Sequence, residues 1–193
     1  GWFASYRAFQ LHFARLAQQA GVELLILGCE MTQTEHREQE WRQLIAAIRE
    51  VYTGALSYNC DKYGEEYVSW WDALDVICSS GYYPIDQMEQ NLNRIEQTVN
   101  TLQKPFFFAE AGCMRVKGSA YRPNDWSLQG SVDPQEQAAW YQALFAACAA
   151  RPWFGGTALW DWPLKGQEKT NRYAFVGMPA QEVIRTYYSR KAE

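Results

Sequence analysis

The sequence has little positive charge, few histidines and no long hydrophobic run. Its 193 residues include 18 Lys or Arg against 22 Asp or Glu, for a formal net charge of -4, so it lacks the basic surface that binds nucleic acid. No apolar run approaches the roughly 20 residues that span a bilayer, and we expect no membrane partner. Residues 1–21 lack the apolar core of a signal peptide, which favours a cytoplasmic location.

Metal and dinucleotide motifs are missing as well. The five cysteines form no CxxC pair and there are two histidines, so we expect no metal site. No GxGxxG follows an apolar run, which argues against a dinucleotide-binding fold, and we expect no cofactor. The cysteines are interpreted as small buried thiols in a reducing compartment: Cys29, Cys60, Cys78, Cys113 and Cys148.

Apolar runs and amphipathic segments alternate along the chain. Each connection between apolar runs is long enough to be a crossover, which predicts one α/β domain with a parallel sheet covered by helices. The predicted strands span residues 22–29, 55–60, 74–83, 105–110 and 155–160. The predicted helices span residues 2–20, 32–51, 87–102, 135–150 and 180–190.

Two of the helices carry specific end signals. Gly21 is suited to end the first helix, and Thr32 with Glu35 three residues later fits a capping box at the start of the second. Apolar residues recur at helical spacing in both helices. In the first they are Phe3, Tyr6, Phe9, Phe13, Leu16 and Ala17, and in the second Trp41, Leu44, Ile45 and Ile48.

Two apolar runs each end in a glutamate. The run KPFFFAEAG delivers Glu110 just before a small-residue turn, and VELLILGCE ends in Glu30. Runs of this kind are typical of buried parallel strands, whose carboxyl ends meet at one edge of the sheet. We therefore expect both carboxylates at the buried rim of one cleft, an arrangement suited to acid/base and nucleophilic chemistry on a glycosidic bond.

Other polar and aromatic residues also follow the predicted strands. They are Asn59, Tyr82, Tyr83 and Trp160. Side chains that converge from the carboxyl ends of many strands onto one rim are typical of a (β/α)8 barrel. Five strands make only part of such a barrel.

With these residues the chain resembles glycoside hydrolases of clan A, most closely family 113, whose known members are endo-β-1,4-mannanases. The similar stretches are GCEMTQTEHREQEWRQLI, YNCDKYGEEYVSWWDALDVICSSGYYPI, KPFFFAEAGC and GTALWDWP. The resemblance implies a partial (β/α)8 TIM barrel in which the five strands are strands four to eight. It implies a single domain over the whole chain.

The resemblance also implies a retaining hydrolysis of β-1,4-linked mannan or a related β-glycan. By motif, Glu30 takes the role of the acid/base and Glu110 that of the nucleophile, with their carboxyl groups roughly 5 to 5.5 Å apart. Cys29 stands where the clan usually has asparagine, which removes one expected hydrogen bond to a sugar hydroxyl. An exo-acting β-glycosidase of the same clan is an alternative, and so is a catalytically silent sugar-binding or assembly module.

Further substrate-binding residues are proposed beside these two. The resemblance implies that Tyr82 or Tyr83 donates a hydrogen bond to the nucleophile, and the strand alternation leaves open which one does. Trp160 is suited to stack on the apolar face of a pyranose, although a core position would also explain it. The remaining candidates are Asn59, His36 and Trp126, each of which could equally have a structural role.

A five-stranded part of a barrel has two open strand edges, which favour aggregation or pairing. An amino-terminal segment, a second copy of the chain or a rearranged sheet would satisfy them. We expect a homodimer that completes the barrel, because closed symmetric dimers are the commonest assembly.

Overall fold

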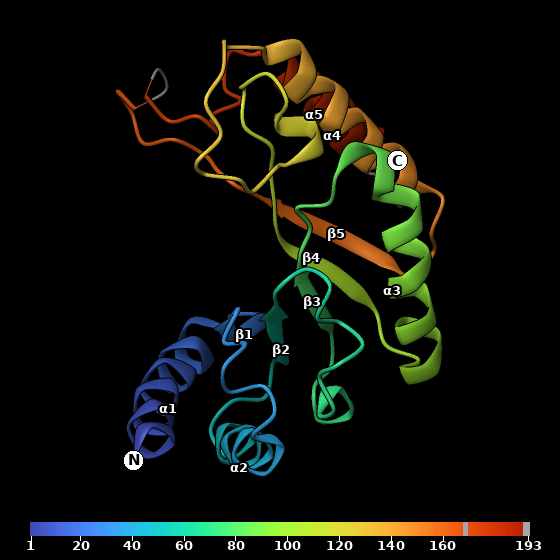
Figure 1. Ribbon diagram of the computed structural model, residues 1–193. Helices are drawn as coiled ribbons and strands as arrows, with labels where there is room; N and C mark the ends of the chain where they lie inside the picture. The colour runs from blue at the N-terminus through green and yellow to red at the C-terminus, as the bar shows by residue number, and fades with distance from the viewer. Residues whose placement is uncertain (168–169, 191–193) are drawn as a thin grey trace. The chain divides into compact units, whose positions relative to one another are not determined.

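The computed structural model describes residues 1–167 and 170–190 (Figure 1). Five strands form one sheet in the order of the sequence, β1-β2-β3-β4-β5. β1 pairs with β2 and β2 with β3 in parallel, with Leu24 opposite Ala55 and Asn59 opposite Cys78. The strands are β1 Leu24–Cys29, β2 Ala55–Cys60, β3 Ile77–Ser80, β4 Phe106–Ala111 and β5 Phe154–Leu159. The predicted parallel sheet is confirmed.

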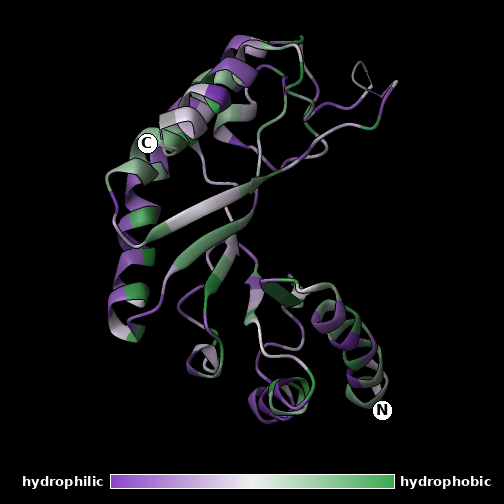
Figure 2. Cartoon of the chain, turned by 180° about the vertical axis from the view of Figure 1, so that it is seen from behind, coloured by the Kyte–Doolittle hydropathy of each residue, from purple (hydrophilic) through white to green (hydrophobic). Residues whose placement is uncertain are grey.

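Helices alternate with these strands as predicted. They are α1 Trp2–Ala20, α2 Glu38–Arg49, α3 Met88–Leu102, α4 Pro134–Ala149 and α5 Pro179–Arg190. Short 3-10 turns lie at Trp71–Ala73, Ile85–Gln87 and Ser119–Tyr121. Figure 2 shows β4 as a mostly hydrophobic strand and β5 as a paler one, in keeping with FFFAEA and FGGTAL. In the described residues, no helix is both long and apolar enough to cross a membrane.

The chain forms two compact units. The first comprises residues 1–79 and 97–107, and the second residues 80–96 together with the described residues from 108 onward. β1, β2, α1 and α2 therefore belong to the first unit, and β5, α4 and α5 to the second.

An aromatic cluster fills the core of the first unit. The indole of Trp41 in α2 is fully buried and stacks on Trp70 with ring centroids 4.7 Å apart. Tyr58 of β2 packs against both rings, at 5.2 and 5.0 Å. The predicted apolar stripe of α2 is buried, namely Trp41, Leu44, Ile45 and Ile48.

The second predicted helix begins later than the sequence suggested. α2 starts at Glu38, and its N-cap residue, Arg37, makes no side-chain capping bond, so the predicted capping box is wrong. Core residues hold the preceding segment in turns instead. The Trp41 indole donates to the carbonyl of Thr34 at 3.0 Å, and the Tyr58 hydroxyl donates to the Glu35 carboxylate at 2.7 Å. The second bond uses the Glu35 carboxylate, which a capping box with Thr32 would need.

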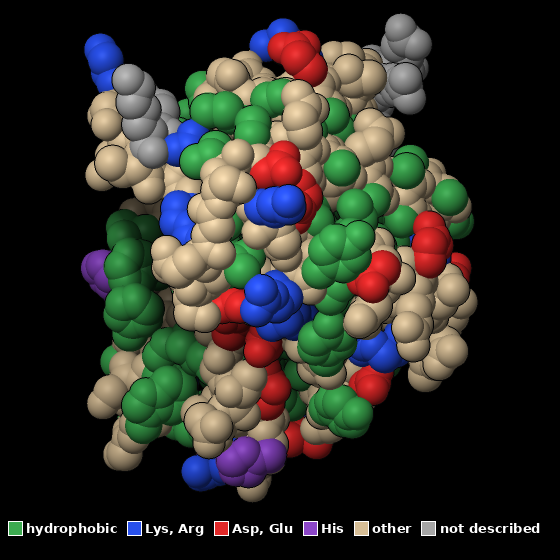
Figure 3. All heavy atoms as spheres, turned by 45° about the horizontal axis from the view of Figure 1, so that its top comes forward, with side chains coloured by type: hydrophobic (Ala, Val, Ile, Leu, Met, Phe, Trp, Pro, Cys, Tyr) green, Lys and Arg blue, Asp and Glu red, His purple; other side chains and the backbone are tan. Residues whose placement is uncertain are grey.

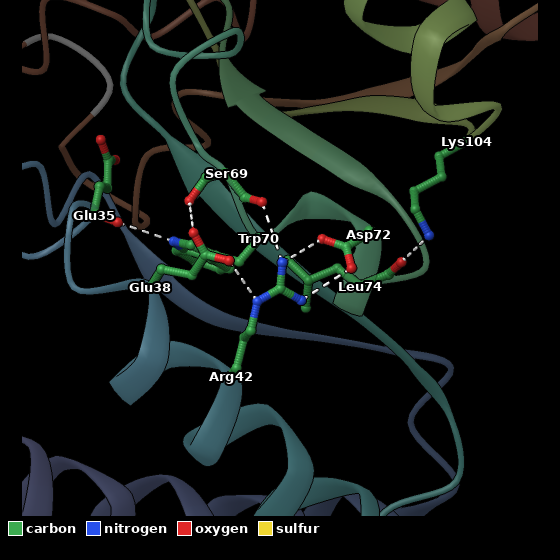
Figure 4. Close-up of polar contacts among 8 residues, drawn as sticks. All are labelled: Glu35, Glu38, Arg42, Ser69, Trp70, Asp72, Leu74 and Lys104. Atoms are coloured by element: carbon green, nitrogen blue, oxygen red, sulfur yellow. Dashed lines mark hydrogen bonds and ion pairs between the residues drawn. The ribbon is translucent and has the colours of Figure 1, made fainter.

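A polar network joins α2 to the loop of residues 61–74 (Figure 4). Arg42 contacts Glu38 Oε1 and Asp72 Oδ1, each at 2.7 Å, and donates to the carbonyl of Ser69 at 3.3 Å. The hydrogen bond from Arg42 lowers the pKa of the Asp72 carboxyl. Trp70 donates its indole N–H to the carbonyl of Glu35 at 3.0 Å. The network thus holds the loop where its tryptophans enter the core.

α1 presents a different face from the predicted one. The helix spans the predicted residues and ends at Gly21, whose φ of 64° is left-handed. Its buried residues are Gln10, Ala14 and Ala17, whereas Phe9 and Phe13 are 54% and 45% exposed. The Gln10 amide donates to the carbonyl of Leu27 at 3.0 Å, which fixes this face against β1. Figure 3 shows hydrophobic side chains gathered on the side where α1 lies in Figure 1.

The predicted strand of residues 74–83 is much shorter in the structure. β3 covers only Ile77–Ser80. Before it, the N–H of Leu74 closes a turn by bonding to the carbonyl of Trp71. After it, Tyr82 and Tyr83 lie beyond the last strand residue. Gly81 continues the pairing with one bond, from its N–H to the carbonyl of Glu110 at 2.6 Å. The turn after β3 therefore begins beside the residue that ends the predicted strand 105–110.

The second unit is built around α4. Its buried side chains surround the helix and include Trp140, Tyr141 and Phe145, and Phe145 stacks on Tyr187 of α5 at 4.1 Å. Asp133 caps α4 by accepting the N–H of Glu136 at 3.0 Å. The Glu136 carboxylate in turn accepts the N–H groups of Gly118 and Ala120, at 2.9 and 2.8 Å. The long segment before α4 is thereby tied to its first turn.

Candidate active site

Glu110 lies near the carboxyl end of β4 and is held by the two residues that follow β3. Its backbone carbonyl accepts the N–H of Gly81, and its carboxylate Oε2 accepts the hydroxyl of Tyr82 at 2.9 Å. A Cβ at Gly81 would lie 2.9 Å from the ring of Phe108, so this close approach requires glycine. Glu110 is half-buried.

The structure distinguishes the two candidate tyrosines. Tyr82 is 6% exposed and reaches the Glu110 carboxylate, whereas Tyr83 is fully buried. The backbone carbonyl of Tyr83 accepts the indole N–H of Trp140 at 2.8 Å, and its ring lies 6.1 Å from that of Phe108. Tyr82 is therefore the tyrosine that contacts the candidate nucleophile.

Trp160 follows β5 and lies beside the end of β4. Its backbone N–H donates to the carbonyl of Ala111 at 2.8 Å, and a Cβ at Gly112 would lie 2.2 Å from the Trp160 carbonyl oxygen. The peptide bond between Trp160 and Asp161 is cis. The indole is 38% exposed. The second unit thus brings the backbone of Trp160, whose side chain is partly exposed, next to the residues that directly follow Glu110.

Trp126 borders a pocket farther along the same unit. Its ring is 62% exposed and lies 4.8 Å from that of Tyr173, which in turn lies 6.4 Å from Tyr82. The pocket measures about 360 Å³ and is lined by Trp126, Asp161, Gln167, Thr170, Asn171 and Arg172. Sequence reasoning missed the pocket residues Gln167, Thr170, Asn171 and Arg172, because they lie in a loop without any local motif, whereas Asp161 belongs to the stretch GTALWDWP.

Glu30 lies in the first unit, directly after β1. Its N–H donates to the carbonyl of Asn59 at 2.8 Å, and its φ of 50° is left-handed. The side chain is exposed in this chain, so the expected buried rim is wrong for Glu30. Because Glu30 and Glu110 belong to different units, the separation of their carboxyl groups stays a prediction.

Asn59 and His36 lie in the same unit as Glu30. Asn59 is 2% exposed, and its side-chain amide donates to the sulfur of Cys29 at 3.2 Å. His36 is exposed and lies in the turn before α2, although the predicted helix of residues 32–51 included it. Asn59 therefore supports the strand end that carries Glu30, while His36 lies on the surface of the following turn.

Four of the five cysteines are buried, as expected, but Cys29 is exposed. Burial raises the pKa of the Cys78 thiol to about 11 and that of the Cys113 thiol to about 12. These two thiols are therefore protonated near neutral pH. Within the part of the chain that the structure describes, no group of three or more His, Cys, Asp or Glu side chains is arranged to hold a metal ion.

Sequence reasoning missed Tyr58 and Glu35 as site candidates. Tyr58 Oη accepts the N–H of Met31 at 2.7 Å and donates to Glu35 Oε1 at 2.7 Å. The sequence offered a weak signal, since Tyr58 directly precedes Asn59 at the end of a predicted strand. The contact with Glu35 could not be predicted, because Glu35 lies in a turn before α2 and the sequence had placed it inside a helix.

Most of the chain is similar to known proteins of one family. The model of Glycoside Hydrolase Family 113 matches residues 1–175. No match was found among curated proteins. A solved β-1,4-mannanase of this family, in a complex, is 48% identical with a TM-score of 0.92, and the match covers 97% of this chain and 62% of that one. The β-mannanase AaManA of the same family from Alicyclobacillus acidocaldarius, in complex with ManMIm, is 40% identical with a TM-score of 0.91 and the same coverage.

A more distant match shows the fold alone. A β-glucuronidase from Faecalibacterium prausnitzii is 17% identical with a TM-score of 0.71, and the match covers 97% of this chain and 35% of that one.

The chain spans 62% of the length of the mannanases that it matches, which agrees with the predicted partial (β/α)8 barrel. On the family match and the identity to solved members, the chain belongs to glycoside hydrolase family 113.

Proposed function

We propose that the chain carries the catalytic pair of a retaining glycoside hydrolase that cleaves β-1,4-linked mannan or a related β-glycan. Glu110 is the nucleophile and Glu30 is the acid/base. Membership of family 113, whose solved members similar to this chain are β-mannanases, supports this substrate class. The observation that carries the proposal is the hydrogen bond from Tyr82 to Glu110 Oε2 at 2.9 Å.

This hydrogen bond suits a carboxylate that must attack as an anion. A donor on one carboxylate oxygen fixes the plane of the group and leaves the other oxygen to attack. In the first step an oxygen of Glu110 bonds to the anomeric carbon while the glycosidic C–O bond breaks, and Glu30 gives its proton to the leaving oxygen. In the second step Glu30 takes a proton from water, which attacks the anomeric carbon and releases Glu110.

The remaining candidates are proposed to contact the sugar. The exposed indole of Trp160, beside the end of β4, is suited to stack on a pyranose. We propose that Asn59 supports the Glu30 end of the site and that His36 borders it. The buried ring of Tyr83 favours packing, so we propose Tyr82 as the tyrosine at the nucleophile.

Activity on defined substrates tests the proposed function. We expect release of short oligosaccharides from β-1,4-mannan, and the first product seen by proton NMR should have the β configuration, which indicates retention. Release of mannose alone would favour the exo-acting alternative. Binding of oligosaccharide without hydrolysis would favour the silent sugar-binding module.

The assembly that completes the barrel is part of the proposal. The solved relatives are longer than this chain, and the exposed apolar residues of α1, among them Phe9, Phe13 and Leu16, suit a covered face. We propose that a second copy covers it, although a preceding segment of a longer protein would do so equally well. A cytoplasmic location also stays a prediction.

The dimer predicts a definite particle size. Light scattering coupled to size exclusion is expected to give twice the chain mass of 22.3 kDa. Replacing the exposed Phe9 and Phe13 by Ser should shift the mass towards one copy, because their apolar surface would then no longer be covered on association. A stable monomer of the unsubstituted chain would rule out the dimer and favour a preceding segment.

The pocket at Trp126 predicts a dependence on substrate length. We propose that it is an outer sugar-binding subsite, because its exposed ring and polar lining match the two faces of a pyranose. Trp126→Ala is expected to lower kcat/KM for mannohexaose by about 10-fold, the scale of one or two lost stacking contacts. The value for mannotriose should stay nearly unchanged. An equal loss with both substrates would place Trp126 outside any outer subsite.

A further inference from the structure

The backbone at Glu30 has an unusual conformation that its neighbours hold in place. Its φ of 50° is left-handed, a region that residues other than glycine and asparagine seldom adopt. Two successive N–H groups are bonded to two successive residues of β2: that of Glu30 to the carbonyl of Asn59 at 2.8 Å, and that of Met31 to the hydroxyl of Tyr58 at 2.7 Å. Such conformations persist only where the surroundings determine them.

The Tyr58 hydroxyl can accept the N–H of Met31 because its own proton is donated to Glu35. A phenol has one proton to donate, and that of Tyr58 goes to Glu35 Oε1 at 2.7 Å. Burial, reinforced by the Glu35 contact, raises the pKa of Tyr58, so the hydroxyl keeps its proton. The oxygen is thereby left as an acceptor for the Met31 N–H. The ring cannot turn away, because it is fully buried against Trp41 and Trp70.

Glu35 is fixed at its backbone as well as at its carboxylate. Its carbonyl accepts the indole N–H of Trp70 at 3.0 Å, and Figure 4 shows its carboxyl group pointing away from that indole. Burial raises the pKa of the half-buried Glu35 carboxyl, against the opposing effect of the Tyr58 hydrogen bond. The order of contacts runs from Trp70 through Glu35 and Tyr58 to Met31, the residue after Glu30.

We infer that Tyr58 and Glu35 are positioning residues that set the direction of the Glu30 carboxyl group for proton transfer. The inference rests on the proposed acid/base role of Glu30. Neither residue needs to touch the sugar. They fix the backbone turn from which Glu30 projects, and a misplaced proton donor weakens catalysis only where a proton must be delivered.

Two aryl β-mannosides distinguish a loss of proton delivery from a general loss of catalysis. Phenyl β-mannoside has a leaving group that needs a proton, whereas dinitrophenyl β-mannoside leaves without one. Tyr58→Phe is expected to lower kcat/KM for the phenyl substrate by about 10- to 100-fold and to leave that for the dinitrophenyl substrate nearly unchanged. Glu35→Ala should behave in the same way. Glu35→Gln should restore much of the loss, because its amide oxygen also accepts the Tyr58 hydroxyl.

Tyr52→Phe is the matched control. Tyr52 is 1% exposed, and its hydroxyl donates to the carbonyl of Val22 at 2.7 Å, at the opposite end of β1. The substitution removes the hydroxyl of a second tyrosine that is almost fully buried, without touching the Glu30 turn. Both substrates should therefore react with this variant as with the unsubstituted protein. An equal loss on both substrates for Tyr58→Phe would overturn the inference.

Hydrogen exchange of the Met31 amide provides a readout that needs no activity. We expect faster exchange in Tyr58→Phe and Glu35→Ala, and no change in Tyr52→Phe, because only the first two lose the acceptor or its orientation. Unchanged exchange at Met31 in Tyr58→Phe would overturn the inference. If the unsubstituted protein hydrolyses neither substrate, the proposed function fails, while faster exchange would still show that the pair holds the turn.

Discussion

Glu110→Gln is expected to abolish hydrolysis of both mannan and aryl β-mannosides. The amide cannot form the ester with the anomeric carbon, so kcat should fall by at least about 10⁴-fold, the scale seen when a covalent nucleophile is removed. The substitution preserves the size of the side chain, and its amide oxygen can still accept the Tyr82 hydroxyl. Thermal unfolding should therefore remain close to that of the unsubstituted protein.

Azide rescue assigns the two roles separately. In Glu110→Ala an azide ion takes the place of the missing nucleophile and should give the α-mannosyl azide. In Glu30→Ala azide attacks the covalent intermediate instead and should give the β-mannosyl azide. Glu182→Gln is the matched control, because Glu182 is an exposed carboxylate in α5 paired with Arg185. Full activity of Glu110→Gln, or the opposite pair of azide products, would contradict the assignment.

Trp41→Ala is expected to have the largest effect on stability. The indole is fully buried, stacks on Trp70, and donates to the carbonyl of Thr34 at 3.0 Å. Removing a buried tryptophan side chain costs about 3 to 5 kcal/mol, through lost burial and the cavity that remains. For a protein of this size Tm should fall by roughly 10 °C. Urea unfolding followed by circular dichroism measures the free energy of unfolding.

Trp162→Ala separates loss of a tryptophan from loss of core packing. Trp162 is 69% exposed and makes an edge contact with Phe175 at 5.6 Å. Its replacement should change the free energy of unfolding by less than about 1 kcal/mol. Similar losses for the two variants would show that the Trp41 cluster does not dominate the stability of the first unit.

Much of the architecture could be predicted from the sequence because the signals are local. The FFFAEA and LLILGC runs identified two strands of the parallel sheet, and Gly21 identified the end of α1. The family stretches extended this to a partial barrel, which the match to solved mannanases supports. Strand ends also indicated Glu30 and Glu110 as candidates, although their roles stay proposals.

The features that sequence reasoning missed depend on contacts between distant residues. The capping box at Thr32 fitted a local rule, but Trp41 and Tyr58 bind Thr34 and Glu35 and delay the start of α2. In α1 the helical spacing was correct, yet Gln10 bonds to Leu27 and turns a partly polar face towards β1. The choice between Tyr82 and Tyr83 likewise required the position of the Glu110 carboxylate.

The tryptophans differ in burial, so their fluorescence should differ in how easily a dissolved quencher reaches it. Trp41, Trp70, Trp71 and Trp140 are at most 2% exposed, whereas Trp2, Trp126, Trp160 and Trp162 are 38% to 69% exposed. Iodide ions quench the fluorescence of indoles that they can collide with, so they should quench the exposed tryptophans and spare the buried ones. An oligosaccharide bound on Trp126 would shield that ring from iodide. Binding should therefore be measurable as a recovery of tryptophan fluorescence, without a label on the protein or the sugar.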